Sequence, residues 1–322
     1  MKYLLLLTLA GLYTLASSGQ SREEFYDHEW KKCDQKKAFF SGQLSQTDSG
    51  VMVKDYYLAN GQLQMSGKYA DFDRKIKNGH FTYYFTDGTI SREGAYEADQ
   101  RNGVWKTYYP NGQLKSLLYF LNNRVGGTGK YWYSNGQLAD SIYNENDTLK
   151  RISWFSNGTV ATTGILHKIT KRPVSNWTYY SRNGKKSMEV VFDEYSKVVT
   201  KACYDEKGAL VAEPKSRTES SPAKWTKWED YLQENLKEPE HVELPKGKRK
   251  IVIVGFNLDE NGAVINAFVK APLHPEYDKA ALALLNNSPE WVASRNYNRE
   301  QRMGEIFRMV DFAKVKKKKQ KS

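Results

Sequence analysis

A short pattern recurs through the middle of the chain and constrains its fold more than any other feature. Each copy has two adjacent aromatic or apolar residues, one or two small or polar residues, an Asn-Gly or Asp-Gly pair, and an aliphatic residue two positions later. Five copies are clear: Tyr57 to Leu63, Tyr84 to Ile90, Tyr108 to Leu114, Trp132 to Leu138 and Trp154 to Val160. Two weaker copies surround Gly184 and Gly208, and successive glycines of the pattern lie 22 to 27 residues apart.

The Asn-Gly and Asp-Gly pairs predict β-hairpins, because these residues tolerate the positive φ angles of tight turns. Pro110 refines the turn, since its fixed φ suits the first position of a three-residue loop that ends on a left-handed Gly112. A second turn is predicted in several units, at Asn78-Gly79, Asn102-Gly103 and Gly126-Gly127. The sequence is therefore expected to be mainly β, with an antiparallel meander of tandem hairpin repeats over residues 51–212 that forms an elongated sheet.

The three-residue loop also predicts which side chains share a face. The residue four before each glycine should oppose the residue two after it, so the expected pairs are Tyr57–Leu63, Tyr84–Ile90, Tyr108–Leu114, Trp132–Leu138 and Trp154–Val160. We expect these columns to form one packed face. Strand alternation sends the remaining aromatic residues to the opposite face. Those residues are Phe81, Tyr83, Phe85, Trp105, Tyr109, Tyr131, Tyr133, Phe155, Trp177 and Tyr179.

Seven residues of that second set form a candidate aromatic platform: Tyr83, Trp105, Tyr109, Tyr131, Tyr133, Trp177 and Tyr179. Two interpretations remain open. The rings could stack on sugars, peptides or other rings, as in a carbohydrate-binding repeat protein. Alternatively, a single-layer sheet needs cross-strand aromatic pairs on both sides, and exposed tyrosine is then ordinary sheet surface.

The array resembles the MORN-like repeats of bacterial proteins known as YwqK-type antitoxins. The aromatic pair, the Asn-Gly turn and the trailing aliphatic residue carry the resemblance, which covers about half of the chain. Repeat arrays of this kind are general interaction scaffolds, so the resemblance implies an architecture and a binding role and no particular activity.

The C-terminal part predicts a second, smaller domain over residues 225–313, after a polar linker at 213–224. Apolar residues at helical spacing from Trp228 to Leu236 indicate a first helix. Two strands, Ile251 to Leu258 and Ala263 to Lys270, flank a turn. A second helix begins at Pro275, and residues 305–313 alternate as a last strand. The predicted order is α-β-β-α-β.

This order and several segments resemble the TonB C-terminal domain in its Bacteroidetes-type form. The segments are Asn235 to Glu240, Ile251 to Gly262, His274 to Ala281, Pro289 to Trp291 and Val310 to Phe312. The resemblance implies a domain that binds an envelope protein or peptide, such as an outer-membrane receptor, by strand addition at its last strand. The candidate partner-binding residues are Ile306, Phe307, Arg308, Met309, Val310 and Phe312.

The N-terminus predicts export across the inner membrane to the periplasm or cell envelope. Residues 1–18 read as a signal peptide, with Lys2 before a short leucine-rich stretch, and residues 19–50 form a lead-in segment. No stable membrane span is expected. A TonB-like energy transducer is the alternative function, yet it would need an inner-membrane anchor and a Pro-rich spacer. In an oxidising compartment Cys33 and Cys203 could form a disulfide, although a rigid array would hold them apart, and both outcomes stay open.

The formal charge of +12 is concentrated at the C-terminus, where six of the last nine residues, 314–322, are lysines. This tail is predicted to be disordered, and it could be a solubilising segment or an arm for acidic surfaces. The rest of the chain is only mildly basic, which argues against a nucleic-acid partner. The five histidines show no metal-ligand spacing and no catalytic motif is present, so we expect a non-enzymatic protein without metal or cofactor.

Overall fold

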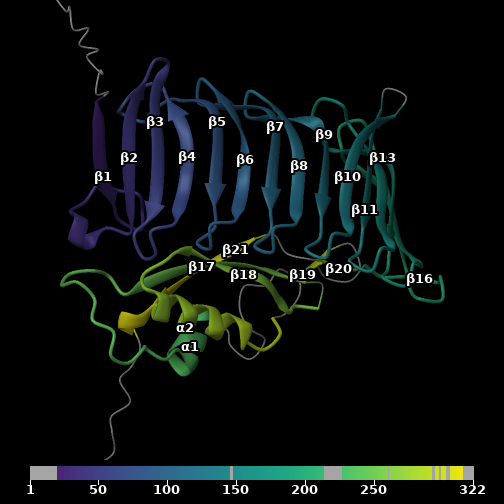
Figure 1. Cartoon of the computed structure of the whole chain (residues 1–322). Helices are drawn as coiled ribbons and strands as arrows, with labels where there is room; N and C mark the ends of the chain where they lie inside the picture. The colour runs from purple at the N-terminus through teal and green to yellow at the C-terminus, as the bar shows by residue number, and fades with distance from the viewer. Residues whose placement is uncertain are drawn as a thin grey trace, which may run out of the picture.

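The computed structural model describes residues 20–145, 148–213, 227–259, 261–291, 294–296, 299–301 and 305–314. The predicted signal peptide, most of the linker and the lysine tail beyond Lys314 lie outside these residues. The described chain is mainly β. It has one long antiparallel sheet and a small α+β unit that lies against the ends of the strands on one side of that sheet (Figure 1).

Sixteen strands form the long sheet, and each strand pairs with the next one in the sequence. Their bounds are β1 Ser21–Tyr26, β2 Phe40–Thr47, β3 Gly50–Tyr57, β4 Leu63–Tyr69, β5 Lys77–Tyr84, β6 Ile90–Glu97, β7 Gln100–Tyr108, β8 Leu114–Leu121, β9 Arg124–Trp132, β10 Leu138–Glu145, β11 Thr148–Trp154, β12 Val160–Leu166, β13 Pro173–Tyr180, β14 Lys186–Phe192, β15 Val198–Tyr204 and β16 Leu210–Val211. The predicted meander is confirmed, and it includes the lead-in strands β1 and β2.

The predicted three-residue loop is confirmed between β7 and β8. The Tyr109 N–H donates to the Gln113 carbonyl at 2.8 Å, and the Gly112 N–H donates to the Tyr109 carbonyl at 2.9 Å, so residues 110–112 form the loop. Gly112 has a φ of 79°, which an L side chain rarely adopts. The pairs Tyr84–Ile90, Tyr108–Leu114, Trp132–Leu138 and Trp154–Val160 follow as predicted.

The first repeat departs from this register. Tyr56, not Tyr57, opposes Leu63, because the Tyr57 N–H closes a loop one residue longer by donating to the Gln62 carbonyl. Tyr57 therefore takes the place that Tyr109 has in its own repeat. The hydroxyls of both tyrosines donate to a main-chain carbonyl at the end of the next repeat, to Tyr84 and Trp132 respectively.

The turn asparagines bond one repeat to the next. The Asn111 carboxamide oxygen accepts from the Gln113 N–H at 3.1 Å, while its Nδ2 donates to the Ser134 carbonyl at 2.9 Å. Asn60, Asn135 and Asn157 make the corresponding pair of hydrogen bonds. Asparagine, unlike aspartate, can both accept within its turn and donate across to its neighbour.

The second turns lie elsewhere than predicted. Between β6 and β7 the turn is Ala98-Asp99, and between β8 and β9 it is Asn122-Asn123, with all four residues at positive φ. Asn102-Gly103 and Gly126-Gly127 lie inside β7 and β9, and Asn78-Gly79 lies inside β5. Glycine at positive φ inside a strand marks irregular pairing, and the register shifts opposite each of these sites.

The prediction of which face is packed is wrong. The rings assigned to the opposite face are the buried ones, with Phe81 at 0%, Phe155 at 2% and Trp105 at 4% exposure. Rings lie flat against glycines of the neighbouring strand, so that a Cβ on Gly67, Gly94 or Gly164 would fall 2.1–2.3 Å from a ring atom of Phe81, Trp105 or Trp177. We call this side of the sheet the ring face.

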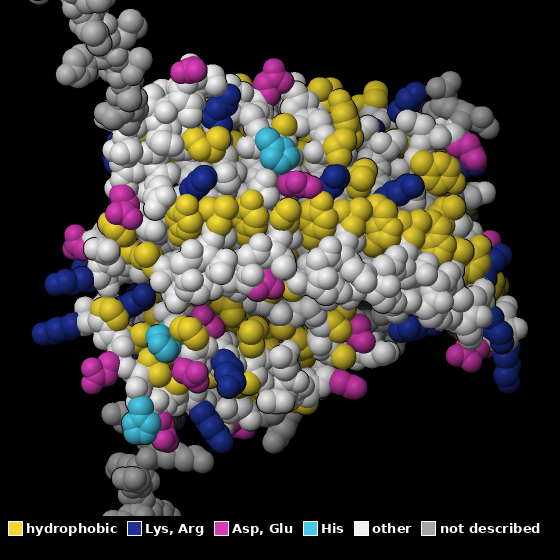
Figure 2. All heavy atoms as spheres, viewed as in Figure 1, with side chains coloured by type: hydrophobic (Ala, Val, Ile, Leu, Met, Phe, Trp, Pro, Cys, Tyr) yellow, Lys and Arg dark blue, Asp and Glu magenta, His cyan; other side chains and the backbone are white. Residues whose placement is uncertain are grey.

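The columns expected to be packed form a half-exposed row on the other side, with Ile90 at 37% exposure. We call this row the exposed belt. It consists of Tyr56, Leu63, Tyr84, Ile90, Tyr108, Leu114, Trp132, Leu138, Trp154 and Val160. Figure 2 shows hydrophobic side chains in an unbroken row across this side of the sheet.

The C-terminal unit has the predicted five elements and a short hairpin besides. Its bounds are α1 Trp228–Asn235, β17 Ile251–Leu258, β18 Val264–Ala271, α2 Pro275–Asn286, β19 Ser294–Asn296, β20 Arg299–Gln301 and β21 Ile306–Asp311. Strands β18, β17 and β21 form a sheet in that order, with β17 in the centre, while β19 and β20 pair only with each other. Tyr277, Ala281 and Leu285 of α2 are buried against this sheet.

The C-terminal unit packs below the strand ends that carry the Asn-Gly and Asp-Gly turns (Figure 1). One hydrophobic cluster joins Tyr26, Phe40 and Tyr57 of the first strands to the C-terminal core. Farther along the edge, the rings of Phe85 and Phe268 meet at 5.0 Å between centroids. The two parts therefore share a core, although the sequence predicted separate domains.

Candidate functional site

The predicted partner-binding strand is the edge strand β21. Its residues alternate, with Ile306 and Val310 buried in the core and Phe307 and Met309 at 40% and 42% exposure. Phe312, in the 3-10 turn Phe312–Lys314 that follows, is also buried. Phe307 and Met309 are therefore the most exposed of the six predicted residues, and Arg308 is half-buried.

The outer edge of β21 pairs with no strand of the described residues, but two of its carbonyls accept side-chain hydrogen bonds. The Trp228 indole N–H donates to the Met309 carbonyl at 3.2 Å, and Arg308 Nη1 donates to the Phe307 carbonyl at 3.0 Å. In an antiparallel ladder the N–H and C=O of one residue point the same way. The Met309 N–H therefore also points away from β17, toward the open edge.

A groove lies between this edge and α1. It encloses about 260 Å³, and Leu232 of α1 and Leu236, the residue that follows this helix, line it together with Met309 and Asp311 of β21. Glu229, Gln233 and Lys314 supply the polar part of its lining. An extended peptide could pair with β21 here while its side chains enter an apolar groove.

The candidate aromatic platform is not exposed. Six of its seven residues are buried, with exposures from 1% for Tyr109 to 9% for Tyr83 and Tyr133, and Tyr131 is half-buried. The prediction of an exposed aromatic platform is therefore wrong. The rings instead form the core of the array, where Tyr69, Phe81, Tyr96 and Trp105 pack edge to face.

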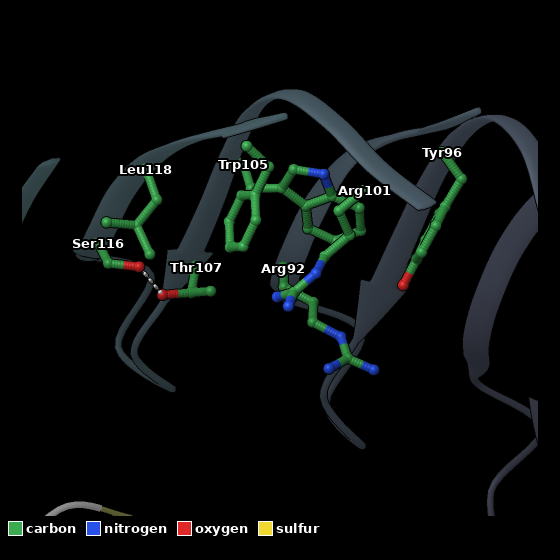
Figure 3. A pocket seen from close by; sticks show the side chains of 8 residues that line it. Arg92, Tyr96, Arg101, Trp105, Thr107, Ser116 and Leu118 are labelled. Atoms are coloured by element: carbon green, nitrogen blue, oxygen red, sulfur yellow. Dashed lines mark hydrogen bonds between the residues drawn. The ribbon is translucent and has the colours of Figure 1, made fainter. Parts of the chain in front are cut away.

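A pocket opens on the ring face over strands β6, β7 and β8 (Figure 3). It encloses about 230 Å³, and its lining residues are Arg92, Tyr96, Arg101, Trp105, Thr107, Ser116, Leu118 and Phe120. The side chains of Arg92 and Arg101 lie next to each other between Tyr96 and Trp105. Thr107 and Ser116 are joined by a hydroxyl–hydroxyl hydrogen bond of 2.7 Å. Sequence reasoning missed both arginines, because nothing in their spacing distinguishes them from surface residues.

Cys33 and Cys203 are free thiols that lie near opposite ends of the sheet, so the candidate disulfide does not form in this structure. Cys33 follows β1 and is half-buried, while Cys203 is buried in β15. Among the described residues, no three His, Cys, Asp or Glu side chains are placed to hold a metal ion. No helix in this part of the chain is long and apolar enough to cross a membrane.

Together, the sequential hairpins, the cross-repeat asparagines and the ring-on-glycine packing define a β-hairpin repeat protein. The family model described as a MORN repeat variant matches residues 101–122, which cover nearly all of the hairpin formed by β7 and β8. The matched residues include Arg101 and five further residues that line the pocket: Trp105, Thr107, Ser116, Leu118 and Phe120. No curated protein matches the chain in sequence. MORN-type repeats suggest a repeat-based protein-interaction scaffold.

Proposed function

We propose that the protein is a non-enzymatic interaction scaffold of the cell envelope, and that β21 receives an extended peptide from an envelope protein. The observation that carries this proposal is the edge of β21, where Met309 is exposed and lines the groove formed with α1, and Phe307 is exposed two residues before it. The resemblance of the C-terminal sequence to TonB C-terminal domains supports the same binding mode. The exposed belt adds a long hydrophobic surface of the kind that often contacts other proteins.

Two substitutions at one position test strand addition. Met309→Ala removes the side chain and keeps the main-chain N–H, whereas Met309→Pro removes both. Because that N–H points away from β17, the proline takes no hydrogen bond from the existing sheet. Short random peptides are first selected on the full chain, and their affinities for both variants are then measured.

We expect Met309→Pro to bind the selected peptides at least about tenfold more weakly than Met309→Ala, a loss of about 1.4 kcal/mol. Trp228→Phe frees the Met309 carbonyl from the indole and should bind at least as tightly as the natural chain. Equal binding by the proline and alanine variants, with equal melting temperatures, would refute strand addition at β21.

Export is tested separately, by cell fractionation and by the mass of the mature N-terminus. We expect a form that lacks residues 1–18 and is released with the periplasmic or envelope fraction. Recovery of the unprocessed chain from the cytosol would contradict the envelope location.

A further inference from the structure

Arg74 is an arginine whose guanidinium contacts both aromatic rings and a carboxylate of this protein. Its guanidinium lies 5.4 Å from the ring centroid of Tyr69 and 5.2 Å from that of Tyr26. It also forms an ion pair of 2.5 Å with the carboxylate of Asp55, which is 1% exposed. The arrangement thus has two parts, aromatic rings that stack on the cation and a carboxylate that neutralises it.

Arg92 and Arg101 have the aromatic rings but not the carboxylate. Arg92 lies 4.1 Å from the ring centroid of Tyr83, and Arg101 lies 4.0 Å from that of Phe120. In the described part of the chain, no acidic side chain forms an ion pair with either arginine. Both extend into the pocket in Figure 3, so two guanidinium groups face one small space without a counter-charge.

Lys270 carries a further positive charge near Arg92, outside the lining of the pocket. Burial lowers the pKa of Lys270 on β18, Glu305 opposes this, and the nearby positive charge of Arg92 lowers it further. Glu305 is itself ion-paired with Lys115 at 2.9 Å. Like charges gathered in this way are destabilising unless an anion binds among them.

We propose that the pocket binds an oxyanion, a carboxylate or a phosphate, carried by a small ring-bearing ligand. Guanidinium groups present planar pairs of donors that match the oxygens of both anions. The Thr107–Ser116 hydroxyl pair supplies further polar contacts, and Trp105, Leu118 and Phe120 supply an apolar wall. This site is separate from the β21 groove and does not depend on peptide binding there.

Calorimetry on the full chain at low salt tests the proposal with three probes of similar size. Benzoate and phenyl phosphate carry the two candidate anions, and benzyl alcohol is the uncharged control. Arg92→Met/Arg101→Met removes both charges and keeps unbranched apolar stems over the rings. Lys54→Gln/Arg172→Gln removes two charges from exposed positions outside the pocket and is the matched control.

We expect at least one anion to bind saturably, and the tighter of the two identifies the group. The methionine pair should weaken that binding at least about tenfold, which corresponds to about 1.4 kcal/mol. The matched control should change it by less than about twofold, because its two exposed charges lie outside the pocket and act on it only through water. Arg92→Lys/Arg101→Lys keeps point charges without the planar donors and should fall between the natural chain and the methionine pair.

Three results would overturn the proposal: binding of neither anion, equal binding of the alcohol, or unchanged affinity in a folded methionine pair. The Met309→Pro variant should retain anion binding. Its behaviour separates a failure of this site from a failure of strand addition at β21.

Discussion

Gly94→Ala is the substitution for which the ring face makes the sharpest prediction. The added Cβ would lie 2.3 Å from Cδ2 and 2.4 Å from Cε2 of Trp105, where about 3.4 Å or more is an ordinary contact. The indole cannot move freely, because its N–H donates to the Ala95 carbonyl at 3.0 Å and its ring meets Tyr96 edge to face at 5.0 Å. The ring must therefore shift by about 1 Å and strain or lose these contacts.

The expected loss in free energy of unfolding is about 2–3 kcal/mol. Overpacking costs about 1–3 kcal/mol, and a strained hydrogen bond adds about 1 kcal/mol. The higher strand propensity of alanine returns about 0.5–1 kcal/mol. Hydrogen exchange at the amides of β6 and β7 measures the loss locally, because a repeat array opens in parts.

A double-mutant cycle with Trp105→Leu tests the cause. If the indole is the obstacle, Gly94→Ala should cost less in the leucine background by about 2 kcal/mol. An equal cost in both backgrounds would refute the reasoning, as would stabilisation by Gly94→Ala in the natural chain. The matching variants Gly67→Ala and Gly164→Ala should behave in the same way.

Three further predictions concern the turns, the second helix and the thiols. Asn111→Asp should lower the free energy of unfolding by about 1 kcal/mol in urea titrations, whereas Asn183→Asp should cost less, because within the described residues Asn183 bonds inside its own turn and makes no bond to the next repeat. Burial raises the pKa of Asp278 to about 6, above the unfolded value of about 3.9, so the folded state holds the proton more tightly. The free energy of unfolding should therefore fall as the pH rises from about 4 to 6, and Asp278→Asn should flatten this slope in melts across that range. Burial raises the pKa of both thiols, and the half-buried Cys33 should react with a thiol reagent before the buried Cys203. Peptide mass spectrometry after timed labelling measures the order of reaction. The reverse order would contradict the burial pattern.

The sequence predicted the repeat architecture well, because its signals are local. Asn-Gly turns and the fixed φ of Pro110 act within a few residues, and they determine the loop and the pairs from Tyr84–Ile90 to Trp154–Val160. Tyr57 shows the limit of such reasoning. One extra loop residue shifts its register and moves its ring from the exposed belt to the core.

The choice of the packed face failed because it depends on contacts between strands. Both faces carry aromatic residues, so alternation alone cannot rank them. The signal that could have decided it is the glycine on each neighbouring strand, such as Gly94 beside Trp105, where a bare backbone lets a ring lie flat. The pocket could not be predicted either, because Arg92 and Arg101 converge only through the pairing of β6 with β7.

The shared core between the two ends of the chain has a consequence for synthesis. Every strand of the array pairs with its sequence neighbour, so each hairpin can form as soon as it leaves the ribosome. Tyr26, Phe40 and Tyr57, in contrast, are buried only after Trp228 and the residues that follow it have been synthesised and have packed against them. The first strands to be synthesised are thus the last to have their apolar residues buried. Until the C-terminal unit has folded, these residues stay accessible to chaperones and proteases and can aggregate.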